Sequence, residues 1–90
     1  MDREEAHGIL NQHLDRFEAL GHDELSTRIG QAETLEVATD RGKAYQLEFE
    51  AIWDSHPGGT IRVLGSIDDG GLRALMPLSD DRLVPPRSST

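Results

Sequence analysis

The spacing of the apolar residues changes once along this chain, from a helical period to a strand period. Across residues 2–20, apolar side chains recur every three or four positions, at Ala6, Ile9, Leu10, Leu14, Phe17 and Leu20. Residues 44–53 alternate instead, with one apolar side formed by Tyr45, Leu47, Phe49, Ala51 and Trp53. No helical spacing separates the later strands, so parallel crossovers are disfavoured. The sequence predicts an α+β fold in which an N-terminal amphipathic helix packs on a four-stranded antiparallel β-meander.

The predicted helix has a signal at each end. Asp2 is placed to cap its first turn, with Glu5 at the third helical position, and Gly21 suits the left-handed conformation that ends a helix. The face opposite the apolar stripe is expected to be a solvated acidic face, and it contains His7, Asn11, Asp15 and Glu18.

Four strands are predicted, over residues 32–39, 44–53, 60–67 and 72–78, with Gly-rich turns between them. The last two strands form a hairpin whose loop is residues 68–71. Opposite residues of a hairpin share a face, so the apolar positions set its register. That register pairs Ile67 with Leu72, Val63 with Met76 and Ile61 with Leu78.

The chain is long enough for one small core. It has 90 residues, of which 36% are apolar, and such a domain has room for one helix on one sheet. We expect a single α+β domain over residues 1–78. Residues 79–90 are polar and contain Pro85 and Pro86, so we expect a flexible C-terminal tail there.

Charge and cysteine content exclude several functions. The formal net charge is −8, which disfavours binding to nucleic acid and to anionic membranes because both need clusters of Lys and Arg. The absence of Cys excludes disulfides, thiolate zinc sites and cysteine nucleophiles. The apolar runs are short and the N-terminus is acidic rather than basic, so a cytoplasmic protein is expected. No cofactor is predicted.

The outer face of the predicted sheet is the first candidate for function. The predicted register places Leu64 opposite Leu75, with Ile52 diagonal to Leu64. Charged residues of both signs surround these three, namely Glu48, Glu50, Arg62 and Arg73. An apolar centre with a polar rim is typical of protein interfaces. This pattern predicts a non-enzymatic interaction module that binds itself, as a homodimer, or another protein, including a basic partner that it neutralises. Paired leucines that only stabilise the sheet are the structural alternative.

A second hypothesis is a small enzyme or a metal-dependent binder. The meander brings His56 and Asp54 to the same end of the sheet as Asp80 and Asp81. Imidazole and carboxylate groups together suit a divalent metal or general-base chemistry. A surface histidine before a Pro-Gly-Gly turn explains His56 equally, and no catalytic motif accompanies it. The sequence therefore leaves enzymatic activity undecided and favours its absence.

A resemblance extends over about half of the chain, residues 35–78. Its motifs are Trp53-Asp54, Pro57-Gly58-Gly59, the run from Gly65 to Gly71, and Pro77-Leu78. This stretch resembles a family of small bacterial domains of unknown function. The resemblance implies a small α+β domain and implies no catalytic residue or substrate.

Overall fold

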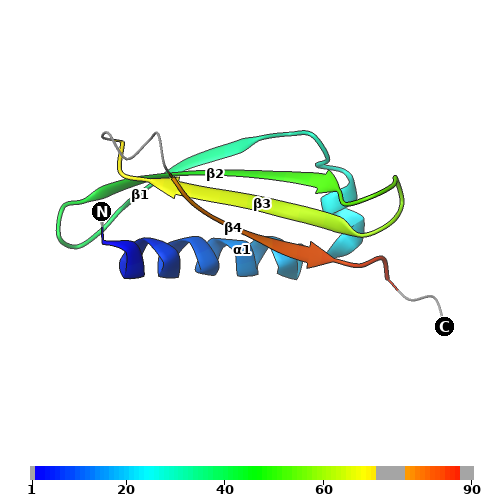
Figure 1. Ribbon diagram of the computed structural model, residues 1–90, viewed down its shortest axis with the longest axis horizontal. Helices are drawn as coiled ribbons and strands as arrows, with labels where there is room; N and C mark the ends of the chain where they lie inside the picture. Colours follow the sequence, from blue (N-terminus) through cyan, green and yellow to red (C-terminus); the bar gives the residue numbers. More distant parts are fainter. Residues whose placement is uncertain (1, 71–76, 88–90) are drawn as a thin grey trace.

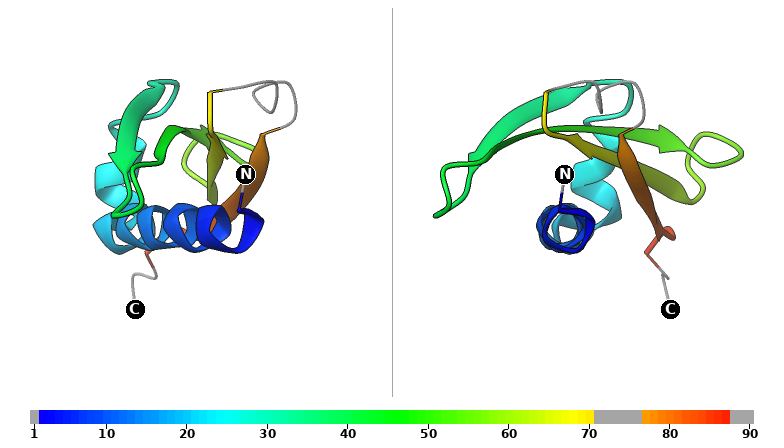
Figure 2. Two further views of the ribbon diagram at one scale, coloured as in Figure 1. Left: turned by 90° about the vertical axis from the view of Figure 1, so that its left-hand side faces the viewer. Right: turned by 60° about the vertical axis from the view of Figure 1, so that its left-hand side comes forward.

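The computed structural model describes residues 2–70 and 77–87, and it contains one helix and one sheet. Helix α1 (Arg3–Ser26) is followed by strands β1 (Glu33–Ala38), β2 (Ala44–Trp53), β3 (Ile61–Asp68) and β4 (Leu78–Val84) (Figure 1). The strands are antiparallel and neighbour each other in chain order, β1-β2-β3-β4. The sheet arches over the helix in Figure 2. The predicted α+β fold is confirmed.

Helix α1 begins where the capping pattern predicts and continues beyond its predicted end. Asp2 Oδ1 accepts a hydrogen bond from the Glu5 N–H at 3.0 Å, which satisfies one free amide of the first turn. Gly21 has the predicted positive φ, 85°, and its non-helical backbone ends the first helical segment of α1, as predicted. The helix then resumes through Ser26, because this last turn buries Leu25 completely against the core.

The core lies between α1 and the inner face of the sheet. The alternation predicted for β2 is confirmed, since Tyr45, Leu47, Phe49 and Ala51 are buried and Trp53 is half-buried. The other buried apolar residues come from α1, β3 and β4, and they are Ala6, Leu10, Leu14, Leu25, Ile61, Val63, Ile67 and Val84. The Phe17 and Phe49 rings pack with centroids 4.8 Å apart.

The fourth strand differs from its prediction. β4 spans Leu78–Val84, so Ile67 lies opposite Leu78 rather than Leu72, and Ile61 lies opposite Val84 rather than Leu78. The predicted strand over residues 72–78 and its partner Met76 fall mostly outside the described residues. The error has a physical cause, because two inward positions of β4 are the charged residues Asp80 and Arg82. These hide the apolar alternation that the prediction used.

The predicted boundary between domain and tail also moves. Residues 79–84 belong to β4, and Val84 is buried with 7% of its surface exposed. A flexible tail beginning at residue 79 is therefore wrong.

Helix α1 does not cover the sheet evenly. It packs mainly on β3 and β4, less on β2, and has no comparable contact with β1. Leu35 and Val37 on the inner side of β1 are consequently only half-buried. Within residues 2–70 and 77–87, no helix is long and apolar enough to span a membrane.

Two glycines give a test of this packing. A Cβ on Gly65 would lie 2.9 Å from Phe49 Cε1 and 3.0 Å from Leu10 Cδ1, whereas one on Gly8 would meet nothing within 4 Å. We expect Gly65→Ala to lower the free energy of unfolding by about 1–3 kcal/mol through overpacking. Gly8→Ala in the exposed helix should raise it by about 0.5–1 kcal/mol. Urea unfolding followed by Trp53 fluorescence measures both changes. Equal changes in the free energy of unfolding for the two variants would contradict the packing of α1 against Gly65.

Tyr45 gives a second test, because it is the only tyrosine in the chain. Burial, followed by the hydrogen bond that its hydroxyl donates to Glu5 Oε1 at 2.7 Å, raises the pKa of Tyr45 to about 12. The phenol should ionise near pH 12 in the native protein and near 10.0 after denaturation, measured by tyrosinate absorbance. The folded pKa is the higher one, so this stabilisation is complete below pH 10 and is lost as the pH rises towards 12.

Glu5→Gln is the matched control for this titration. It removes the charge of the carboxylate that accepts the Tyr45 hydrogen bond, so the native midpoint should fall towards 10.0. It should stay above that value, because burial is the largest cause of the shift. A native midpoint equal to the denatured one would show that Tyr45 is not enclosed by α1.

Candidate functional site

Among residues 2–70 and 77–87, three large aliphatic side chains lie on the face of the sheet away from α1. Leu64 of β3 and Leu83 of β4 are 40% and 49% exposed, and Ile52 of β2 is half-buried. We call these three residues the outer patch. Ile52, Arg62 and Leu83 lie opposite one another across three strands, and Leu64 is two residues beyond Arg62 on the same face. The strands therefore place the outer patch around Arg62.

Two carboxylates hold Arg62 in place. Its Nε and Nη2 lie 2.9 and 2.8 Å from Asp54 Oδ1, and its Nη1 donates to Asp81 Oδ2. These hydrogen bonds, with Asp54 first and Asp81 second, raise the pKa of Arg62 above its usual range. The guanidinium is thus fixed and neutralised between β2, β3 and β4. The positive charge beside the outer patch is partly exposed but is paired with two carboxylates.

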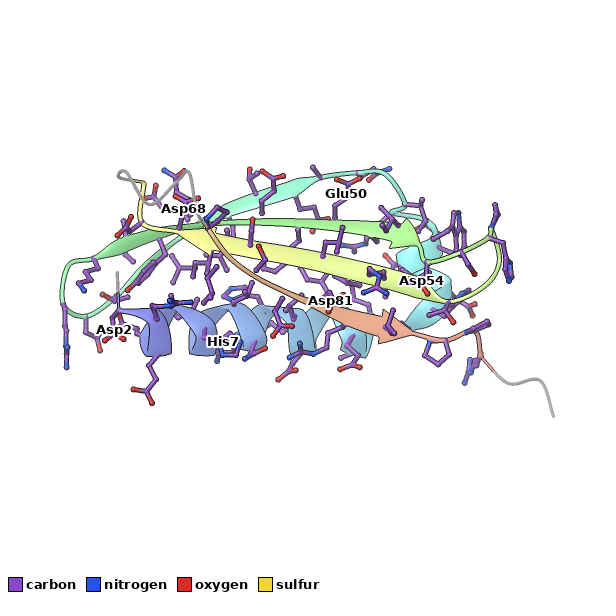
Figure 3. The ribbon with its side chains drawn as sticks, viewed as in Figure 1. Asp2, His7, Glu50, Asp54, Asp68 and Asp81 are labelled. Carbon is purple, nitrogen blue, oxygen red and sulfur yellow. The ribbon has the colours of Figure 1, made fainter. Side chains whose placement is uncertain are left out.

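The rim of the outer patch is acidic. Glu48 and Glu50 of β2 lie on the same face, and Glu50 points away from the helix in Figure 3. Within residues 2–70 and 77–87, neither side chain forms an ion pair or a hydrogen bond. A shallow hollow of about 280 Å³ lies between these acids and Leu64, floored by Gly65 and Ser66.

The structure alters the predicted composition of this surface. Leu64 lies opposite Asp81, so its predicted pairing with Leu75 is wrong. Leu75 and Arg73 lie outside the described residues. Leu83, which was assigned to the tail, is instead the third member of the outer patch. Sequence reasoning missed it because the charged residues before it concealed the strand.

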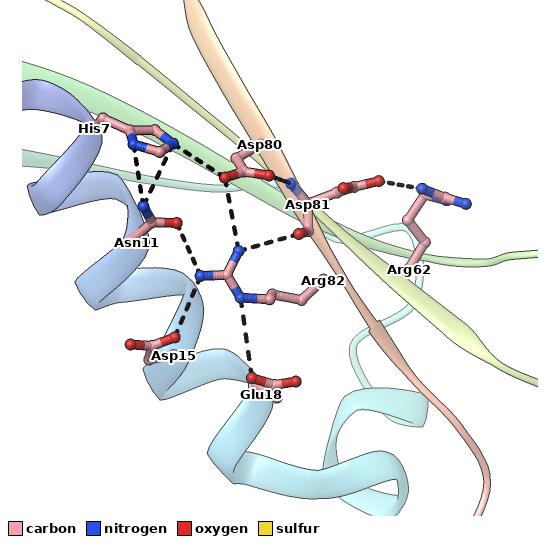
Figure 4. A network of polar contacts seen from close by, with 8 residues as sticks. All are labelled: His7, Asn11, Asp15, Glu18, Arg62, Asp80, Asp81 and Arg82. Atoms are coloured by element: carbon pink, nitrogen blue, oxygen red, sulfur yellow. Dashed lines mark hydrogen bonds and ion pairs between the residues drawn. The ribbon is translucent and has the colours of Figure 1, made fainter. Parts of the chain in front are cut away.

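A polar network joins the opposite, inner side of β4 to the helix (Figure 4). His7 Nε2–H donates to Asp80 Oδ2 at 3.2 Å, and Arg82 Nη2 donates to Asn11 Oδ1 at 2.8 Å and to Asp15 Oδ1 at 3.3 Å. The Arg82 guanidinium also lies 4.0 Å from Glu18. His7, Asp15 and Glu18 on the predicted solvated face of α1 are exposed, as predicted, and the same face also contacts β4. The sequence contained one signal of this contact, because Asp80 and Arg82 are two residues apart on β4 and therefore lie on the same face.

Asp80 is held ionised within this network. The hydrogen bond from the Asp81 N–H at 2.8 Å, followed by the one from His7 and the charge of Arg82, lowers the pKa of Asp80. Burial opposes this shift. The carboxylate is thus a structural acceptor that joins strand and helix, rather than a base poised to take a proton.

The predicted metal or catalytic residues do not come together. Asp54 and Asp81 are bridged by Arg62 on the outer face, whereas Asp80 lies on the inner face with His7. His56 sits in the β2–β3 turn, where its Nδ1 is 3.3 Å from the carbonyl of Pro57. Among residues 2–70 and 77–87, no group of three or more His, Asp or Glu side chains could hold a metal ion.

Comparison with known proteins gives no relative. No protein-family model, curated protein or solved structure matches the chain. The side chains of the outer face and the edges of the sheet are therefore the basis for a functional proposal.

The polar network predicts an acid-dependent contribution to stability. Because the folded pKa of Asp80 is lowered, its contribution is present above the unfolded value near 3.8 and is lost as the pH falls through the folded value. We expect Asp80→Asn to lower the free energy of unfolding at pH 7 by about 0.5–1 kcal/mol, a range set by partial exposure. The difference from wild type should shrink as the pH falls below 4 in urea unfolding.

Asp15→Asn is the control for this measurement. Asp15 contacts the same Arg82 guanidinium but its side chain is 69% exposed, so its loss should matter less. A deficit in Asp80→Asn that is unchanged at low pH would show that the carboxylate charge does not hold β4 to the helix.

Proposed function

We propose that this protein is a non-enzymatic interaction module that binds a basic protein partner through the outer patch. The observation that supports this most is the pair of exposed leucines, Leu64 and Leu83, beside a fixed and neutralised Arg62. Exposed leucines at the centre of an acidic surface resemble the apolar centre and polar rim of an interface. Their removal from water on binding would supply affinity, and the rim would supply selectivity.

The charge of the surface argues for a foreign partner over a second copy. Glu48 and Glu50 are unpaired within the described chain, and each copy has a formal net charge of −8. Placing two outer patches face to face would bring these acids together, and like charges across an interface are costly. A surface rich in Lys and Arg would instead pair with them. Self-association is therefore the less favoured form of this proposal.

Leu64→Asp tests the proposal directly. Wild type and variant are each used as bait in affinity capture from the lysate of the source cells, with quantification of the retained proteins. We expect at least one basic protein to be retained by wild type and reduced at least tenfold with Leu64→Asp. Loss of one apolar contact at an interface centre, worth about 1.4 kcal/mol or more, gives a change of this size.

Leu20→Asp is the matched control. Leu20 on α1 is 41% exposed, against 40% for Leu64, so both substitutions place the same charge at an equally exposed leucine. The control should retain the same proteins as wild type. Light scattering after size exclusion tests self-association. If the protein self-associates through the outer patch, wild type and Leu20→Asp will be dimers and Leu64→Asp will be a monomer. If wild type and both variants retained the same proteins and had the same molar mass in solution, the outer patch would be excluded as a binding surface.

A further inference from the structure

The two edge strands of the sheet differ in how their free backbone groups are satisfied. β1 and β4 are the edges, and within residues 2–70 and 77–87 each has one side without a neighbouring strand (Figure 1). In an antiparallel sheet, successive residues of an edge strand point their N–H and C=O groups alternately to the neighbour and to the free side. Groups on the free side can pair with a strand from another chain.

The hydrogen bonds at the hairpins show which residues face outward. The Thr39 N–H donates to the Lys43 C=O at 2.8 Å, so odd-numbered residues of β1 bond to β2. Thr34, Glu36 and Ala38 therefore point their backbone groups to the free edge. At the other hairpin, the Asp54 N–H donates to the Thr60 C=O at 2.8 Å, so odd-numbered residues of β3 bond to β4. Their β4 partners are even-numbered, and Asp81 consequently faces outward.

On the free edge of β4, the backbone N–H and C=O groups of Asp81 are already hydrogen-bonded to the side chains of Asp80 and Arg82. The Asp81 N–H donates to Asp80 Oδ1 at 2.8 Å, and the Asp81 C=O accepts from Arg82 Nη1 at 3.1 Å. The same two side chains contact the helix through His7 and Asn11 (Figure 4). An incoming strand would have to break this network to pair with Asp81. Inward-pointing charges of this kind protect sheet edges.

In the described chain, the outward backbone groups of β1 have no comparable side-chain hydrogen bonds. The outward N–H and C=O groups of Thr34, Glu36 and Ala38 have no hydrogen-bond partner within residues 2–70 and 77–87. All three residues are exposed, and Leu35 and Val37 between them are half-buried on the inner side. β1 therefore offers backbone groups together with an apolar strip that α1 does not cover.

We propose that β1 binds an extended segment of a partner protein, which adds to the sheet as a fifth strand and alternates apolar and basic residues. Apolar side chains of the segment extend the strip formed by Leu35 and Val37. Basic side chains on the other face lie beside Glu36, whose side chain has no partner in the described chain. Main-chain hydrogen bonds provide affinity, and alternate side chains provide specificity, as in other cases of strand addition.

The acidic edge disfavours a second copy as the added strand. Antiparallel pairing of two β1 strands centred on Glu36 sets the two carboxylates directly opposite each other, which is destabilising. Each copy also has a formal net charge of −8. A basic segment removes this repulsion. The β1 site is separate from the outer patch, so either proposal can fail without the other.

The test uses the whole isotope-labelled chain and a blocked peptide of alternating valine and lysine as the probe. We expect chemical-shift changes centred on β1, with amide exchange slowed at least tenfold at Thr34, Glu36 and Ala38. The same peptide N-methylated at every residue keeps its charge but loses its donors, so it should bind at least tenfold more weakly. Equal binding of the two peptides would show charge attraction without strand pairing and overturn the proposal.

Substitutions at Glu36 locate the site on the protein. Glu36→Pro removes an N–H that the sheet does not use, which an edge strand tolerates, and should abolish the slowed exchange at β1. Glu36→Lys keeps the backbone intact and should weaken peptide binding about tenfold through reversed charge, which tests the site even if the proline variant fails to fold. Asp23→Lys makes the same change in net charge at an exposed position on α1, outside the sheet, and should bind like wild type.

Other results would overturn the proposal. Peptide-induced changes centred on β4 or on the outer patch would place the binding elsewhere, as would loss of binding in Leu64→Asp. If, without peptide, amide exchange at β1 became slower as the protein concentration increased, the added strand would be a second copy of the chain. Peptide binding to β1 that survives Leu64→Asp would support strand addition whatever the outcome for the outer patch.

Discussion

The width of a single helix determines most features of this molecule. A helix with its side chains is about 10–12 Å across, and strands in a sheet are about 4.8 Å apart. One helix therefore covers two or three strands, and this sheet has four. Helix α1 lies mainly on β3 and β4, so β1 is left at the uncovered side (Figure 2). The difference between the two edges begins with this arrangement.

The position of α1 also explains why charged residues are tolerated on the inner face of β4. Asp80 and Arg82 would be costly if they were buried without partners. They instead lie at the margin of the core, where α1 presents His7, Asn11 and Asp15 at hydrogen-bonding distance. The same two side chains form hydrogen bonds with the backbone N–H and C=O of Asp81. Docking of the helix and protection of this edge are consequently one network. At β1, the ion pairs of Arg28 with Glu24 of α1 and with Glu33 reach only the first residue of the strand.

Sequence reasoning succeeded where burial follows a regular period. The helix stripe and the alternation of β2 gave the right fold, because each places apolar residues on a single covered face. It failed for β4, whose inward positions are apolar only at the two ends, Leu78 and Val84, and charged between them, at Asp80 and Arg82. Whether those charges are solvated or paired depends on α1, some 70 residues earlier. Leu64 and Ile52 were predicted for the outer patch, whereas Leu83 required the correct register.

The two proposed surfaces are close enough to serve one partner. Thr34, Glu48, Ser66 and Ser79 form a row across the outer face from β1 to β4. From a strand added beside β1 to Leu64 on β3 is roughly three strand spacings of about 4.8 Å each. An extended chain advances about 3.3 Å per residue, so four or five residues beyond an added strand would reach the outer patch.

Such a short connection would make the second contact intramolecular, with a high effective concentration. Each surface alone is small. The outer patch has three apolar residues, and β1 has only six residues to pair. Weak binding is expected from either one, because the loss of translational and rotational freedom must be offset each time. A partner that engaged both would offset it once, and its basic residues would meet Glu36 and Glu48 along the way. Glu36 of β1 and Glu48 of β2 thus favour a basic chain that crosses the sheet from the free edge of β1.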